Sequence, residues 1–280
     1  MTDTGFRALQ PLEYPVVLPL FQAQDDQLAP LAVLHSAAAG QVYTSNPVGA
    51  PVATVLLVAG HRHYLAGIVD DEAFNRAFHG WLEHNLLVLR SAGEWGLMFY
   101  FAQPAWQAAL EQILAGRGAY PAPRLVYEWV LAPDQPLEQP VLPAGYRLHL
   151  VDADLLAEPS LAALDELRAE LRSERSSEDD FLARSYGYAL LYGVNITGWC
   201  LSEYNLGVRC EVGIATAEPH QRRGLATASG LAFLELARRR GVRRIGWHCW
   251  ARNLASAVTA ERLGFHLVHK YTCYCCPAQP

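Results

Sequence analysis

Apolar and polar positions recur with two different periods along the second half of the chain. Apolar residues at positions 161, 164, 167 and 171 have the spacing of an amphipathic helix. Shorter apolar runs with a period of two predict strands, and Gly193 separates two of them as a hairpin turn would. The predicted order is strand 146–151, helix 160–175, strands 186–192, 195–204 and 209–216, helix 226–240, strand 242–249, helix 254–263 and strand 265–274.

The first half of the chain has a less regular pattern of the same kind. Two apolar runs flank Gly60-His61-Arg62 and predict a pair of strands. Because hairpin, helix, strand, helix and strand follow one another in both halves, we expect the first half to be a diverged copy. Both halves would then be α/β, each with a mixed sheet. The predicted order here is strands 52–58 and 63–68, helix 71–89, strand 97–102, helix 105–114 and strand 124–131.

A proline-rich segment separates the two halves. Proline at such density continues neither a helix nor a central strand, so the segment predicts a linker at residues 132–145. We therefore predict an N-terminal domain at residues 1–131 and a C-terminal domain at residues 146–280. The prolines are Pro133, Pro136, Pro140 and Pro143.

The composition limits the class of protein. Hydrophobic residues make up 51% of the chain and charged residues 18%, as expected of a folded protein. The sequence has no apolar run of about 18 residues or more, and its N-terminus lacks the pattern of a secretory signal. We therefore expect a cytoplasmic protein without a membrane span. Disulfides are then not expected, and Cys273-x-Cys275-Cys276 lacks the spacing of a zinc site, so no metal is predicted.

Charge is unevenly distributed along the chain. The formal net charge of −6 argues against a nucleic-acid-binding surface. Residues 217–265 nevertheless hold nine arginines against three acidic residues, which favours a bound anion there. Residues 151–185 hold ten acidic residues against four arginines. This second segment either faces a cationic partner or is a solvated helix surface.

The segment Gln221-Arg222-Arg223-Gly224-Leu225-Ala226 lies between a predicted strand and a predicted helix. Backbone N–H groups at the start of a helix are unpaired and attract phosphate. Gly224 and Ala226 would let a pyrophosphate approach the backbone, and Arg222 and Arg223 add positive charge. Taken alone, the same segment is also compatible with an ordinary turn.

A second segment, residues 247–265, places Asn253 after a strand, Ser256 one turn later and Gly264-Phe265 at the end of a helix. With the preceding loop, it resembles the GNAT superfamily of acetyl-coenzyme A dependent N-acetyltransferases. In that superfamily a Q/R-x-x-G-x-G/A loop follows the fourth strand, and an N-x-x-(A/S)…GF segment comes later. The resemblance covers residues 145–275 and is closest to the zwittermicin-resistance type of GNAT acetyltransferase.

The resemblance implies a GNAT fold in the C-terminal half, with acetyl-CoA as co-substrate. Backbone groups at the end of the fourth strand would pair with the pantetheine arm and the thioester: Ile214, Ala215 and Thr216. The loop and helix start would hold the pyrophosphate: Gln221, Arg222, Arg223, Gly224, Leu225, Ala226 and Thr227. Asn253 and Ser256 would face the pantetheine or the sulfur end.

Catalytic groups are less sharply indicated. Glu211 occupies a position where family members often carry a glutamate, which would act as the general base; His248 is a second candidate. The alternative for Glu211 is a hydrogen-bonding or edge role in the sheet, and a lone histidine near a sheet is more often structural. Ala260 stands where many members have a tyrosine that protonates the thiolate. Tyr271 on the next strand is the candidate replacement, and water or a neighbouring tyrosine, Tyr274, are alternatives.

We therefore expect transfer of an acetyl group to the primary amine of a small-molecule acceptor by direct attack. An acyl-cysteine route through Cys210 or Cys249 stays open. The alternative function is an acetyl-CoA-binding sensor that has lost catalysis. The acidic side chains expected to attract a cationic amine are Glu174, Glu178, Asp179 and Asp180. The sequence does not predict an oligomeric state.

Overall fold

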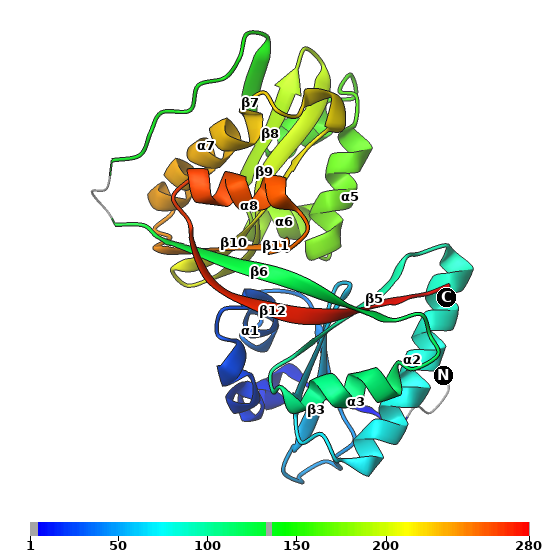
Figure 1. The fold of residues 1–280 in the computed structure, drawn as a ribbon. Helices are drawn as coiled ribbons and strands as arrows, with labels where there is room; N and C mark the ends of the chain where they lie inside the picture. Colours follow the sequence, from blue (N-terminus) through cyan, green and yellow to red (C-terminus); the bar gives the residue numbers. More distant parts are fainter. Residues whose placement is uncertain (1–4, 133–135, 280) are drawn as a thin grey trace. The chain divides into compact units, whose positions relative to one another are not determined.

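The computed structural model describes residues 5–132 and 136–279, and it forms two compact units (Figure 1). One unit comprises Met1–Arg124 together with Tyr271–Pro280, and the other is Leu125–Lys270. The chain therefore changes units twice, inside strand β6 (Tyr120–Val130) and inside strand β12 (His266–Pro277). This division differs from the predicted one, which placed a linker at residues 132–145. Pro133, one of the linker prolines, lies outside the described residues.

The C-terminal unit holds a mixed sheet in the order β6-β11-β10-β9-β8-β7. Strands β7 to β10 are antiparallel, and β10 runs parallel to β11 across helix α7. The strands and helices predicted after residue 146 are present, with two further short helices, α4 and α6. Their bounds are β7 Tyr146–Leu150, α4 Ala153–Ala157, α5 Leu164–Glu174, α6 Glu178–Arg184, β8 Gly187–Tyr192, β9 Asn195–Leu206, β10 Arg209–Thr216, η3 Glu218–His220, α7 Leu225–Arg239, β11 Arg244–Trp250 and α8 Leu254–Arg262.

Helices cover both faces of this sheet. Helices α7 and α8 lie on one face, where they pack against alternate residues of β10 and β11 such as Cys210, Val212 and Trp247 (Figure 1). Helices α5 and α6 cover the other face over β8 and β9. Alternation along a strand therefore assigns Glu211 and His248, which lie between residues of the first core, to the face opposite α7 and α8.

Residues 125–131 complete the C-terminal unit from the first half of the chain. The Leu131 amide donates to Arg243 O at 2.7 Å, and Glu128 forms an ion pair with Arg244. Trp129 is 9% exposed and packs edge-on against Phe265, with ring centroids 5.5 Å apart. The unit thus includes a strand that precedes the predicted linker.

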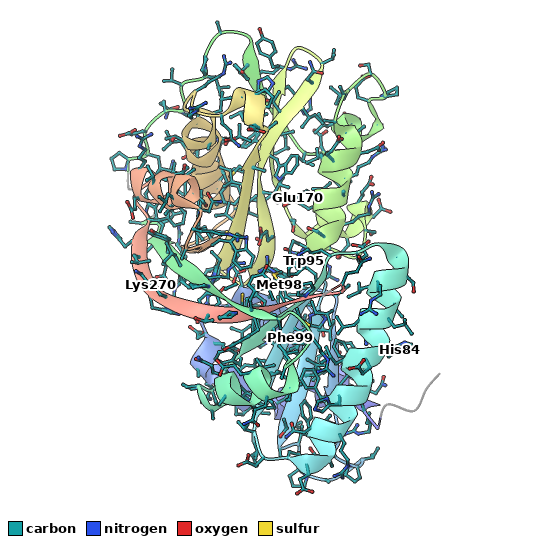
Figure 2. The ribbon with its side chains drawn as sticks, turned by 45° about the vertical axis from the view of Figure 1, so that its right-hand side comes forward. His84, Trp95, Met98, Phe99, Glu170 and Lys270 are labelled. Atoms are coloured by element: carbon teal, nitrogen blue, oxygen red, sulfur yellow. The ribbon has the colours of Figure 1, made fainter. Side chains whose placement is uncertain are left out.

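The N-terminal unit contains a similar arrangement of strands. Strands β2, β3 and β4 are antiparallel, and β5 runs parallel to β4 across helix α2. Residues 274–277 of β12 then pair antiparallel with β5. Phe99 on β5 is fully buried in the core under α2 and α3 (Figure 2). The bounds are β3 Thr54–Ala59, β4 Arg62–Gly67, α2 Glu72–Ala92, β5 Gly96–Phe101 and α3 Ala105–Ile113.

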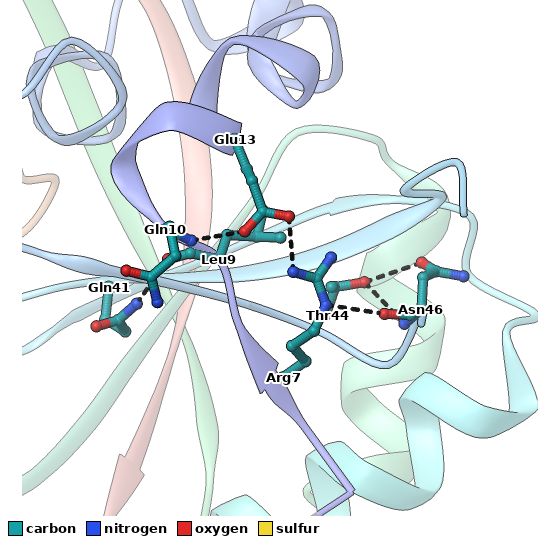
Figure 3. Close-up of polar contacts among 7 residues, drawn as sticks. All are labelled: Arg7, Leu9, Gln10, Glu13, Gln41, Thr44 and Asn46. Atoms are coloured by element: carbon teal, nitrogen blue, oxygen red, sulfur yellow. Dashed lines mark hydrogen bonds and ion pairs between the residues drawn. The ribbon is translucent and has the colours of Figure 1, made fainter. Parts of the chain in front are cut away.

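The segment before β3 was not predicted from the sequence. It consists of short elements: β1 Arg7–Ala8, η1 Pro11–Val16, η2 Leu18–Gln24, α1 Leu28–Leu34 and β2 Gln41–Thr44. Polar contacts join these elements to one another (Figure 3): Glu13 of η1 accepts from Arg7 Nη1 of β1 at 2.7 Å, and Gln41 Nε2 of β2 donates to Leu9 O at 3.2 Å. In the part of the chain that the structure describes, no helix has the length and apolar character needed to cross a membrane.

The shared strands make a specific prediction for fragments. A fragment of residues 146–280, which is the domain expected from the sequence, lacks Trp129 and the rest of β6. Loss of a buried tryptophan alone costs about 3–5 kcal/mol. We therefore expect no cooperative thermal unfolding of this fragment in circular dichroism, whereas a fragment of residues 125–270 should unfold cooperatively. A sharp transition for residues 146–280 would contradict this division of the chain.

Candidate functional site

Strands β10 and β11 separate part of the way along their length. Their parallel pairing runs from Arg209–Arg244 to Glu211–Gly246. Within the described residues it extends no further, although β10 continues to Thr216 and β11 to Trp250. The carboxyl-terminal part of β10, which includes the predicted residues Ile214, Ala215 and Thr216, therefore offers backbone groups that β11 does not pair.

The loop that follows β10 has the conformation of an anion-binding turn. Arg222 and Gly224 both have positive φ values, 61° and 76°. Left-handed residues in such a turn direct successive N–H groups towards one side, where they attract an anion. Gln221 Nε2 donates to Thr216 O at 2.9 Å, which attaches the loop to the end of β10. Residues 221–224 are exposed, so a ligand can reach them.

Helix α7 begins directly after this turn. The Ala228 amide donates to Gly224 O at 3.0 Å, so the N–H groups of Leu225, Ala226 and Thr227 precede this helical bond. The helix dipole adds about half a positive charge at this end. Together, turn and helix start can hold a phosphate group next to the unpaired end of β10.

Asn253 and Ser256 lie at the start of helix α8, where both have partners within the protein. Asn253 Oδ1 accepts from the Ser256 amide at 3.2 Å and caps the helix. Ser256 Oγ accepts from Trp247 Nε1 at 3.0 Å. These bonds fix the beginning of α8 beside β11, and contact with a pantetheine arm stays a prediction.

Glu211 and His248 are brought together at the point where β10 and β11 separate. His248 Nε2 lies 3.6 Å from Glu211 Oε1, and the side chains are 7% and 5% exposed. Glu211 packs over Gly246, whose missing Cβ would lie 3.3 Å from Glu211 Cγ. A carboxylate beside an imidazole on adjacent strands can accept a proton and share it through the pair.

The third predicted catalytic residue, Tyr271, belongs to the N-terminal unit. Its ring centroid lies 6.1 Å from that of Tyr100. Burial raises the pKa of its hydroxyl well above the usual value, and nearby Arg124 opposes this shift. Tyr274 is in the same unit and donates to Glu111; burial raises its pKa to about 12. A role for Tyr271 as the acid stays a prediction.

Ala260, at the position where a tyrosine was expected, is completely buried in the core under α8. The position where the family often has a tyrosine is therefore occupied by a small apolar side chain that packs in the core. Among the residues that the structure describes, no group of three or more His, Cys, Asp or Glu side chains could hold a metal ion.

A β-bulge opposite Glu211 was missed by the sequence analysis. Cys210 pairs with Asn205, but Val212 pairs with Ser202, so Glu203 and Tyr204 together oppose Glu211. Tyr204 donates to Glu174 Oε2 on α5 at 2.5 Å. Residues 195–206 read as one continuous strand, and a bulge depends on the pairing partner, so the sequence alone carried no signal for it.

The acidic residues predicted to attract a cation differ in their surroundings. Glu178 forms ion pairs with Arg172 at 2.8 Å and Arg168 at 3.5 Å. Asp180 forms one with Arg184 at 3.0 Å. Arginines of α5 therefore neutralise Glu178, an arginine of α6 neutralises Asp180, and Asp179 is exposed. Glu174 is the member of the set that reaches the sheet, through Tyr204.

The corresponding crossover in the N-terminal unit is built differently. Strand β4 pairs with β5 from Arg62–Met98 to Leu65–Phe101, which is the last residue of β5. Asp71 caps helix α2 by accepting from the Phe74 amide at 2.9 Å. A carboxylate at this helix start repels a phosphate. The features of a phosphate site therefore occur together in the C-terminal unit alone, among the described residues.

The six cysteines are free and buried. Burial raises the pKa of Cys210 to about 12 and that of Cys276 to about 11. A thiol becomes nucleophilic only as the pH approaches its pKa, so Cys210 is protonated at neutral pH. Cys249 is 4% exposed on the α7 and α8 face. These surroundings favour a role in core packing, and not in covalent catalysis, for Cys210 and Cys249.

Comparison with known proteins gives a consistent result. The family model for GNAT acetyltransferase matches residues 18–274. A curated relative from Bacillus subtilis (strain 168), the uncharacterized N-acetyltransferase YdfB, is 28% identical over 133 residues, which cover 48% of this chain and 49% of the relative. The chain thus matches about half the length of this curated relative.

Solved structures resemble the chain over nearly its whole length. A GCN5-related N-acetyltransferase-like protein from Streptococcus suis 89/1591 has a TM-score of 0.70 at 20% identity, covering 94% of this chain and 98% of that chain. A tandem GNAT protein from the clavulanic acid biosynthesis pathway has a TM-score of 0.60 at 16% identity, with 98% of each chain covered. At such identities the likeness establishes the fold alone.

The burial of the cysteines predicts slow thiol labelling. At pH 8 the Cys210 thiol, with a pKa of about 12, is almost entirely in its unreactive protonated form. We expect the native protein to react slowly with 5,5′-dithiobis(2-nitrobenzoate), and the unfolded protein to release all six equivalents. Rapid labelling of Cys210 or Cys249 in the native protein would contradict this and would restore the acyl-cysteine route.

Proposed function

Because the chain belongs to the GNAT acetyltransferase family, we propose that it transfers an acetyl group from acetyl-CoA to the primary amine of a small molecule. The observation that carries this proposal is the position of the β10–β11 separation. It begins beside the buried Glu211–His248 pair and leads to the anion-binding turn before α7. One end of the separated strands thus suits a pyrophosphate, and the other carries a base.

In this proposal acetyl-CoA is a substrate, and the residues of the C-terminal unit hold its parts. The N–H groups of residues 222–227 would bind the pyrophosphate. Backbone groups of Ile214, Ala215 and Thr216 would pair with the pantetheine arm and the thioester carbonyl, and an amide there would stabilise the developing oxyanion. Asn253 and Ser256 would border the arm in addition to their structural bonds.

The reaction itself would be a direct attack. The amine nitrogen forms a bond to the thioester carbon, the carbon–sulfur bond breaks, and the thiolate leaves. Glu211, assisted by His248, would take the proton from the amine, either directly or through water. With Ala260 at the usual tyrosine position, the thiolate would receive its proton from water.

The remaining expectations form part of the same proposal. The N-terminal half would be a diverged GNAT-like copy, since its antiparallel strands, parallel crossover and order of helices match those of the second half. Its paired β4 and β5 support a structural role for it. The resemblance to the zwittermicin-resistance type supports a small acceptor, and we propose a cytoplasmic location.

A second candidate is a sensor that binds acetyl-CoA without turning it over. Ala260 supports this alternative, because the residue that usually protonates the thiolate is replaced by a buried methyl group. The two candidates share the binding turn and differ in turnover. Release of free thiol on incubation with acetyl-CoA and a panel of primary amines would support the enzyme, and its absence would support the sensor.

The binding turn can be tested with a matched pair of glycines. Gly224 and Gly241 lie at opposite ends of α7, both have positive φ, and an added Cβ would meet no atom within 4 Å at either. Alanine at either position should cost about 1–2 kcal/mol of stability through backbone strain. We expect only Gly224→Ala to weaken acetyl-CoA binding, by roughly tenfold, in isothermal titration calorimetry. Equal affinities of the two variants would place the pyrophosphate elsewhere.

The base can be tested with Glu211→Gln. Removal of a general base lowers kcat by roughly 10²–10⁴-fold, and we expect such a loss with an unchanged acetyl-CoA Kd. Glu178→Gln is the control, since Glu178 pairs with Arg172 and Arg168 away from the strand separation. Full activity of Glu211→Gln would exclude Glu211 as the base.

A further inference from the structure

The anion-binding turn before α7 contains a strained residue. Arg222 has a φ of 61°, in the left-handed region that residues with a side chain rarely adopt. Gly224 also has a positive φ, but glycine adopts it without strain. A non-glycine residue stays in this unfavourable conformation only where its surroundings hold it there. The contacts on either side of Arg222 therefore decide how fully the turn keeps its anion-binding conformation.

Helix α7 holds the turn on its C-terminal side, and hydrogen bonds to the sheet hold it on the other side. The Ala217 amide, just before η3, donates to Thr197 O on β9 at 2.8 Å. Gln221 Nε2 donates to Thr216 O at 2.9 Å, but this contact is exposed, so water competes for it. The N-terminal side of the turn therefore depends on any further attachment that η3 makes.

A side-chain hydrogen bond joins η3 to the distant strand β7. Tyr146 Oη and His220 Nδ1 lie 2.7 Å apart in a half-buried position. His220 is the last residue of η3, two residues before Arg222. Tyr146 is the first residue of β7, the edge strand of the sheet in this unit. The bond therefore attaches the residue that leads into the turn to the sheet itself.

Aromatic rings enclose the imidazole of His220. The Tyr146 ring meets it edge-on, with centroids 5.7 Å apart, and the Tyr192 ring on β8 lies 5.9 Å from it. The two tyrosines pair across β7 and β8, and their rings are 4.8 Å apart. Gly145 leaves space for this packing, because a Cβ added there would lie 2.7 Å from Tyr192 Cε2. The imidazole is thus held by ring contacts as well as by its hydrogen bond.

We propose that Tyr146 and His220 are positioning residues for acetyl-CoA, because their bond holds the turn in the strained conformation that directs its N–H groups towards the pyrophosphate. This inference rests on the proposed function, in which the turn binds that group. When the bond is lost, Arg222 can relax to a negative φ, and the N–H groups no longer point to one side. The measured affinity then falls with the fraction of molecules that keep the binding conformation.

The bond can be removed from either end. Tyr146→Phe keeps the ring and loses the hydroxyl, and we expect it to raise the acetyl-CoA Kd in isothermal titration calorimetry by roughly twofold to tenfold, as loss of one hydrogen bond would. His220→Phe keeps a ring between the two tyrosines and should raise the Kd by a similar factor. The double variant should add little to either single change, since both remove the same bond.

A matched control removes a tyrosine hydroxyl elsewhere in the same unit. Tyr127 donates to Glu261 Oε1 at 3.0 Å, far along the chain from the turn. Tyr127→Phe should therefore leave the acetyl-CoA Kd unchanged. Thermal unfolding followed by circular dichroism shows for each variant that it is folded before titration.

A further variant separates positioning of the turn from general stability. Glycine adopts a positive φ without strain, so Arg222→Gly should keep the turn in place with less help from His220. The variant also loses a positive charge, so the comparison is the effect of Tyr146→Phe within each background. We expect that effect to be lost, or nearly so, in the Arg222→Gly background. A loss of affinity through general destabilisation would be the same in both backgrounds.

The possible failures are distinguishable. If the wild-type protein does not bind acetyl-CoA in the titration, the proposed function is contradicted. If the wild type binds and either Tyr146→Phe or His220→Phe has an unchanged Kd, the inference about these two residues is overturned. An equal effect of Tyr146→Phe in the wild-type and Arg222→Gly backgrounds overturns it as well.

Discussion

The early end of the β10–β11 pairing is the constraint on which the candidate site depends. Two parallel strands that stay paired leave no backbone groups for a ligand, since each carbonyl and amide is satisfied by the neighbour. Here the pairing stops at Glu211–Gly246, and the remaining part of β10 leads to a positively charged helix start. In the N-terminal unit the corresponding parallel strands do not separate in this way, because β4 pairs with β5 as far as the last residue of β5.

Glycines and a bulge determine which side chains gather where the strands separate. Gly246 gives space to Glu211, and Gly213 gives space to Glu203. The bulge then adds a residue to β9 opposite Glu211 and draws Tyr204 towards α5. Small local departures from a regular sheet thus convert a packed surface into a polar one, without any change in the order of strands or helices.

The sequence allowed most of the C-terminal unit to be predicted, because its signals are local. Gly241 after three arginines ends α7, and the apolar period in residues 160–175 identifies α5, although the helix begins only at Leu164. Ala162 instead forms an isolated β-bridge with Asn195, and Ala163 has a φ of 62°. A pairing partner overrode the helical period there.

Other features depend on contacts between distant residues and could not be predicted from the sequence. The segment before β3 consists of elements too short for a period to appear, attached by bonds such as Gln41 to Leu9. The left-handed Arg222 follows from the turn and not from its residue type, since a non-glycine residue rarely adopts positive φ. For the site, the loop motif was visible in the sequence, whereas the contact of Glu211 with His248 and the bulge opposite Glu211 depend on the register of the strands.

The crossing of the chain between its two units affects the order in which they are completed during synthesis. Domains made first usually fold first on the ribosome. In this protein residues 274–277, which pair with β5, are synthesised after every strand of the C-terminal unit. One edge of β5 therefore lacks its pairing partner, β12, while about half of the chain is still being synthesised. An unpaired strand edge of this kind can pair with other chains. The unit that is translated first is therefore exposed to aggregation for the longest time.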